Sequence, residues 1–217
     1  MRRRSPLLVL VAALALLGGA CAGDGELGGP ALGGTPAAVV GDDSVSNADL
    51  RDEVEQWASN PAMLQQIGIA DLGTEGRRTT ELVSFVLSHR IVSEQARLML
   101  VDARRLAEDG EVDLAEVGVD GEVLSEPGDE EIAAILEQLD QQFTSPEGGS
   151  LFQVFDEAFR ETLARDLAYQ DRLQTIVQLG VEAPEVSVSP RFGRAEVLQG
   201  GIVQVVAPTG PVPSLGA

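Results

Sequence analysis

Residues able to do nucleophilic or acid–base chemistry are few in this chain of 217 residues, which has one histidine, His89, and one cysteine, Cys21. One of each cannot build a zinc site of the usual histidine and cysteine ligands, and no glycine-rich phosphate loop is present. The 35 acidic residues could supply the carboxylate pair of a glycosidase, but the few aromatic residues offer little to stack a sugar ring. We therefore expect no enzymatic activity and no cofactor.

The position of His89 favours a structural role. Apolar residues recur at alternating steps of four and three over residues 77–108, which is typical of one face of a long helix, and His89 falls on that face. We expect a buried core side chain rather than a catalytic base. Phe152, Phe155 and Phe159 recur at similar steps and are also expected in the core.

The acidic residues gather between residues 108 and 157, where sixteen acids occur without a basic residue. Asp109 could start a calcium-binding EF-hand loop, but its sixth position, which needs glycine, is Leu114, and its twelfth is Asp120 instead of glutamate. The sequence thus predicts no metal site, and a solvated, mobile acidic loop over 109–128. A formal charge of −20 also excludes nucleic-acid binding, because phosphates require a basic face.

The first 36 residues have the layout of an export signal and a tether. Three arginines precede an apolar run over 7–17, which at about 1.5 Å per residue is too short to span a bilayer. The segment Leu17-Gly18-Gly19-Ala20-Cys21 resembles the lipobox of bacterial lipoproteins, in which the cysteine receives a diacylglycerol. That resemblance implies a signal peptide over 1–20, lipid attachment at Cys21 and a flexible tether over 21–36. An ordinary secretory signal, with Cys21 incidental, is the alternative.

Residues 37–206 have the pattern of one mainly α domain. A strand near residue 39 precedes a helix that Ser46 would cap, and Asn60-Pro61 would start a second helix. Further helices are predicted over about 77–108, 129–143 and 151–179, of which the first is long and central. Alternating apolar and polar residues predict another short strand within 184–206, and a disordered tail is predicted over 207–217.

Three segments of this domain resemble the N-terminal chaperone domain of the SurA, PrsA and trigger-factor-like folding factors, in the lipoprotein form found in actinobacteria. They are the strand, turn and capped helix over 38–50, the acidic helix start over 125–132, and Val186-Ser187-Val188-Ser189-Pro190-Arg191-Phe192-Gly193-Arg194, which is similar to the ending Val-x-Val-Asn-Pro-Arg-Tyr/Phe-Gly. The resemblance implies that the first and last strands pair and close the helical domain. Between Leu179 and Val186 there is no room for the parvulin isomerase domain that such proteins often carry.

The resemblance implies a lipid-anchored chaperone on the extracytoplasmic face of the cell membrane. It would bind unfolded or newly exported polypeptides through an apolar helical cradle, without ATP and without prolyl isomerase activity, and the negative charge would favour basic clients. We expect Trp57, Met63 and Leu64 to contact clients, since large flexible or aromatic side chains suit promiscuous binding, although core packing is the alternative. A second hypothesis is an envelope scaffold that holds one specific folded partner.

Overall fold

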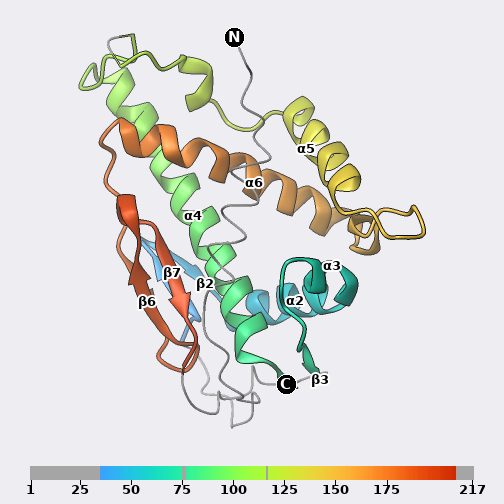
Figure 1. Ribbon diagram of the computed structural model, residues 1–217. Helices are drawn as coiled ribbons and strands as arrows, with labels where there is room; N and C mark the ends of the chain where they lie inside the picture. Colours follow the sequence, from blue (N-terminus) through green and yellow to red (C-terminus); the bar gives the residue numbers. More distant parts are fainter. Residues whose placement is uncertain (1–34, 75–76, 116, 209–217) are drawn as a thin grey trace.

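The computed structural model describes residues 35–74, 77–115 and 117–208 (Figure 1). The predicted signal peptide, Cys21, nearly all of the tether and most of the tail lie outside these residues. The helices are α2 (Asn47–Ala58), α3 (Pro61–Gln66), α4 (Thr80–Glu108), α5 (Asp129–Gln142) and α6 (Glu157–Gln178), with 3₁₀ segments η1 (Gly121–Leu124), η2 (Phe152–Val154) and η3 (Gln199–Gly201). The strands are β1 (Ala38–Val40), β2 (Asp43–Val45), β3 (Gly73–Thr74), β4 (Arg77–Arg78), β5 (Val186–Val188), β6 (Arg194–Val197) and β7 (Val203–Val206). The predicted mainly α class is confirmed.

Side-chain caps fix the starts of the first helices. The Ser46 hydroxyl accepts a hydrogen bond from the backbone N–H of Asp49, and the Asn60 side chain accepts one from Met63, with Pro61 at the first helical position. Such caps satisfy backbone donors that have no partner within the helix. Both predicted helix starts are confirmed.

The start of α6 differs from the prediction. A helix from residue 151 was expected, but the Asp156 carboxylate accepts a hydrogen bond from the backbone N–H of Phe159 at 2.7 Å, and α6 begins at Glu157. Phe155 has an extended backbone between η2 and this cap. The phenylalanine periodicity therefore continues across two separate elements, which is why it did not mark the boundary.

The first and last parts of the domain are joined by a small sheet in which β1 lies between β2 and β5. Both pairings are antiparallel, and Val39 is opposite Ser187 in the register of β1 with β5. The predicted pairing of the N-terminal strand with the strand around Val188 is thus present.

The region after β5 holds more strand than predicted. Instead of one short strand, a separate antiparallel hairpin of β6 and β7 follows. Gly193 enters this hairpin with φ of +132°, and a Cβ atom there would lie 2.1 Å from the carbonyl oxygen of Val206. Only glycine fits this close approach of two backbones.

Helix α4 is the centre of the fold (Figure 1). It packs against α6, α2 and β7, while α5 packs on α6. Buried side chains form two clusters: one includes α2, α3 and the first half of α4, and the other includes the second half of α4 and the end of α6.

Two buried polar side chains of α4 attach the hairpin. The side-chain oxygen of Gln95 accepts a hydrogen bond from the backbone N–H of Val203 at 2.9 Å, and its amide donates to the carbonyl of Gly201 at 3.2 Å. The hydroxyl of Ser88, two helical turns earlier, accepts one from Val205 at 2.9 Å. The strand edge that faces α4 is therefore bonded to the helix as well as packed on it.

Candidate functional site

The three predicted client-contact residues lie in the core. Trp57, Met63 and Leu64 are exposed by 1%, 2% and 0%. The Trp57 ring meets those of Phe85 and Phe155 edge to face, at centroid distances of 5.0 and 5.3 Å. Side chains enclosed in this way cannot touch a client, so the prediction of a contact surface at these residues is wrong and the alternative of core packing holds.

Exposed apolar side chains do not form the predicted cradle in the described part of the chain. The large ones that are exposed lie apart on α4, on the loop after it, on η2 and at the end of β6: Val101, Val117, Val154, Val197 and Leu198. Dispersed residues of this kind are normal on a protein surface and indicate no binding face.

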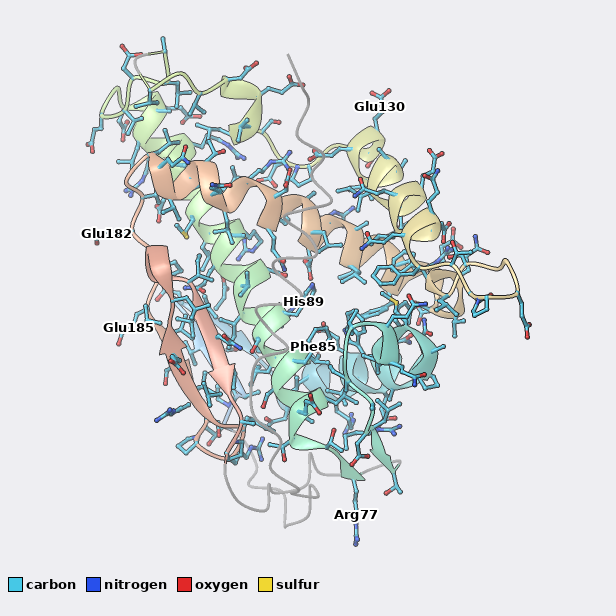
Figure 2. The ribbon with its side chains drawn as sticks, viewed as in Figure 1. Arg77, Phe85, His89, Glu130, Glu182 and Glu185 are labelled. Atoms are coloured by element: carbon cyan, nitrogen blue, oxygen red, sulfur yellow. The ribbon has the colours of Figure 1, made fainter. Side chains whose placement is uncertain are left out.

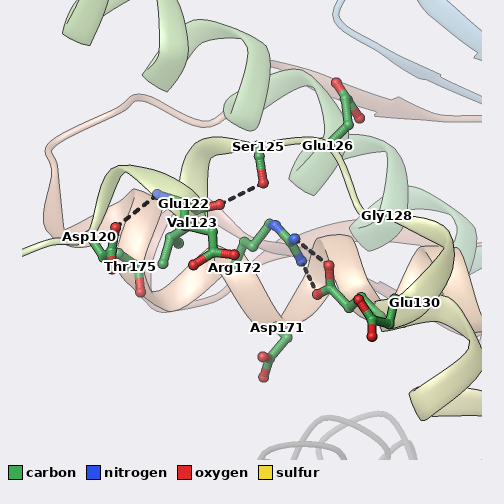
Figure 3. Close-up of a pocket in the computed structure, with 11 residues that line it drawn as sticks. Asp120, Glu122, Val123, Ser125, Glu126, Gly128, Glu130, Asp171, Arg172 and Thr175 are labelled. Atoms are coloured by element: carbon green, nitrogen blue, oxygen red, sulfur yellow. Dashed lines mark hydrogen bonds and ion pairs between the residues drawn. The ribbon is translucent and has the colours of Figure 1, made fainter.

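One charged surface is a groove of about 610 Å³ between the segment 120–131 and α6 (Figure 3). We call it the acidic groove, because its lining contains six carboxylates and one basic side chain: Asp120, Glu122, Glu126, Glu130, Glu131, Asp171 and Arg172. At neutral pH it therefore presents negative charge.

Arg172 is the buried cation of the acidic groove. Its guanidinium donates to both carboxylate oxygens of Glu131 at 2.7 Å and to the carbonyl of Ala168. The hydrogen bond with Glu131 raises the pKa of Arg172 in spite of its burial, whereas burial raises the pKa of the neighbouring Asp171. This pair joins α5 to α6. The other carboxylates of the groove have no second basic residue in its lining to pair with.

The second half of the 109–128 loop contacts α4 and α6. Leu124 is buried, and its carbonyl accepts a hydrogen bond from Arg104 of α4 at 3.1 Å. Glu126 accepts hydrogen bonds from the hydroxyl of Tyr169 and from Arg104, which lower its pKa, while burial and Glu126 raise the pKa of Tyr169 to about 12. Asp120 is exposed, as predicted for the acids of this loop. The mobility of the loop stays a prediction.

A second charged site surrounds His89, in the first half of α4 (Figure 2). It is a pocket of about 270 Å³. We call it the His89 pocket. Helix α2 contributes Asp49, Asp52 and Glu53, and α6 contributes Phe159 and Asp166. The predicted burial of His89 is confirmed, because its side chain is 3% exposed.

The ion pairs of this pocket are long. Nδ1 of His89 lies 3.6 Å from the nearer Glu53 oxygen, just beyond hydrogen-bonding distance, and Arg90 lies 3.9 Å from Asp166. Burial opposes a charge on His89, but Glu53 and Asp166 outweigh it, so the pKa of His89 is raised above 6.5. Burial also raises the pKa of Asp166, and Glu53 adds to this effect.

This arrangement predicts a pH dependence of stability. Because the pKa of His89 is raised in the folded state, its contribution is complete below 6.5 and is lost as the pH rises through the folded value. Urea denaturation at a series of pH values should show the free energy of unfolding falling over that window. His89→Gln should remove this slope; a slope that persists in the variant would contradict the assignment.

Sequence reasoning did not identify Glu53, Asp166 or Arg172 as parts of a site. A signal existed for Glu53, which lies between Leu50, Val54 and Trp57 at the spacing of the buried face of α2. An acid at such a position must find a partner on a neighbouring element.

The described residues contain neither a metal-site cluster nor a membrane-spanning helix, and the chain matches no known protein family. The described residues contain no group of three or more histidine, cysteine or acidic side chains placed to hold a metal ion. Among the described helices, none combines the length and the apolar character that crossing a bilayer requires. No family model, curated protein or solved structure matches this chain.

Proposed function

We propose that this protein is a lipid-anchored, extracytoplasmic chaperone-like lipoprotein that binds unfolded or newly exported polypeptides without ATP and without isomerase activity. The observation that carries the proposal is the acidic groove, which is lined by six carboxylates and one arginine. Of these carboxylates, Glu131 is paired with that arginine and Glu126 with Arg104 of α4. An extended segment rich in arginine or lysine complements such a surface. In this proposal clients are held by charge, and the apolar cradle expected from the sequence is given up.

Two further features support this proposal. The pairing of β1 with β5 and the long helix α4 agree with the architecture that the resemblance to folding factors implies. Weak, screened charge contacts also release a client readily, which a chaperone without an energy source requires. The membrane attachment in this proposal comes from the predicted lipid at Cys21.

The test uses the chain from residue 22 onward and two reduced, denatured clients, basic lysozyme and acidic α-lactalbumin. We expect the protein to suppress aggregation of the basic client as the molar ratio rises, and to do so less at high salt. The acidic client should be protected poorly, because its charge has the same sign as the groove.

A matched pair of triple variants locates the binding surface. Glu122→Gln, Glu130→Gln and Asp171→Asn together neutralise the acidic groove and should weaken binding of the basic client about tenfold, at up to about 1 kcal/mol for each exposed contact. The control removes the same charge from exposed residues near the strands: Glu182→Gln, Glu185→Gln and Glu196→Gln. Equal loss in both variants would show that only net charge matters. No suppression of either client would contradict the proposal and favour the scaffold hypothesis.

A further inference from the structure

The His89 pocket contains two largely enclosed carboxylates whose cationic neighbours are distant. The side chains of Glu53 and Asp166 are exposed by only 13% and 14%. Their cationic neighbours, His89 and Arg90, lie at more than 3.5 Å. Neither ring nitrogen of His89 has a hydrogen-bond partner among the described residues. Burying charged and polar groups without close partners is costly, so the pocket is built as if a further group completes it.

The composition of the pocket identifies the charge of that group. Asp49 and Asp52, which are exposed, line the pocket together with the half-buried Glu53 and Asp166, and Arg90 is the basic residue of its lining. With neutral His89 the lining is thus strongly negative. A cation would meet carboxylates from α2 on one side and from α6 on the other.

The shape and the aromatic ring narrow the choice of cation. The ring of Phe159 lines the pocket, and a guanidinium group can stack on such a ring while it donates hydrogen bonds to carboxylates in its own plane. A volume of about 270 Å³ accommodates one long side chain rather than a folded partner. A bare metal ion fits less well, since no three donors in the described residues are placed to hold one.

We propose that the His89 pocket binds the guanidinium group of an arginine side chain presented by an extended polypeptide. This inference rests on the proposed function and names the side chain that the protein selects, in addition to the general attraction of the acidic groove.

Binding is coupled to protonation of His89. Glu53 from α2, Asp166 from α6 and Arg90 on α4 act on its ring, and Asp49 and Asp52 line the same pocket. A bound guanidinium interacts with the same carboxylates that favour the charged imidazole. Ligand and proton therefore compete, and arginine binds more weakly when His89 is charged.

The single histidine and the single tryptophan of the chain make this competition measurable. The imidazole signals of His89 in NMR spectra are unambiguous, and the Trp57 ring lies 6.2 Å from the His89 ring, so its fluorescence also responds to the charge there. The experiment uses untagged protein from residue 22 onward, with N-acetyl-arginine amide as the probe. The neutral isostere N-acetyl-citrulline amide is the control ligand at equal ionic strength.

We expect a saturating arginine probe to lower the pKa of His89 by about one unit, with about tenfold tighter binding above that pKa than below it. The citrulline probe should leave the titration unchanged. Asp166→Asn should weaken binding of the arginine probe about tenfold, whereas Glu161→Gln, which changes an exposed acid of the same helix outside both sites, should not change it. If Asp166→Asn fails to fold, Glu53→Gln provides the same test.

Three results would overturn the inference: no response of His89 to the arginine probe, an equal response to citrulline, or equal effects of Asp166→Asn and Glu161→Gln. Failure here with normal protection of the basic client would leave the proposed function standing. Conversely, binding of the probe to the pocket without any protection of clients would support the arginine site and contradict the chaperone proposal.

Discussion

Replacement of Trp57 by alanine is expected to lower the free energy of unfolding by about 3–5 kcal/mol. The ring is buried and packs against Phe85 of α4, Phe155 and Phe159, so its removal leaves a cavity where α2, α4 and the start of α6 meet. Edge-to-face contacts between these rings are lost as well. Trp57 thus joins α2 to α4 and to the segment at the start of α6.

Urea denaturation followed by circular dichroism measures this loss without using the tryptophan that is removed. Val101→Ala on α4 is the control, because it deletes an exposed apolar side chain and should change stability by less than about 0.5 kcal/mol. A Trp57→Ala protein of unchanged stability that no longer bound clients would contradict the structural role and would support the original contact hypothesis.

Replacement of Gln95 by leucine is expected to lower the free energy of unfolding by about 2–4 kcal/mol. Leucine has a similar size, but it leaves the buried backbone N–H of Val203 without its acceptor and the carbonyl of Gly201 without its donor. Each buried group left unpaired costs about 1–3 kcal/mol. The loss should be concentrated in the hairpin of β6 and β7, which Gln95 holds against α4.

The comparison variant is Gln174→Leu, which changes an exposed glutamine of α6 and should have little effect on stability. Amide hydrogen exchange locates the change. The amide of Val203 should exchange faster in Gln95→Leu through local opening, whereas the exchange rates of amides in the middle of α6 should change only as far as the free energy of global unfolding changes. Unchanged protection at Val203 would show that packing alone holds the hairpin.

The sequence was sufficient where local interactions decide the structure. The cap by Ser46 and the Asn60-Pro61 start depend on residues within one helical turn, and the apolar periodicity of α4 is an average over many turns. The start of α6 was missed because Asp156, a competing cap, lies inside a continuing phenylalanine pattern. The β6–β7 hairpin was missed because its buried face depends on contacts with α4, far away in the sequence.

The candidate sites were predicted poorly for the same reason. The His89 pocket assembles side chains from α2, α4 and α6, and Arg172 meets Glu131 from another helix. The apolar periodicity of the sequence correctly predicted that His89 is buried, but it could not show which acids surround it. Likewise, tryptophan is a residue type that contact surfaces favour. Only the enclosure of Trp57 by rings from other elements excludes that role.

The position of β1 in the middle of its sheet determines when this protein can fold. Its two neighbours come from very different places in the chain: β2 follows at once, whereas Ser187 of β5 is separated from Val39 by roughly 150 residues. A chain that is made N-terminus first presents β1 long before β5 can pair with it. Throughout that interval β1 has an open edge that can pair with any neighbouring extended chain, and this edge is covered only when β5 has arrived.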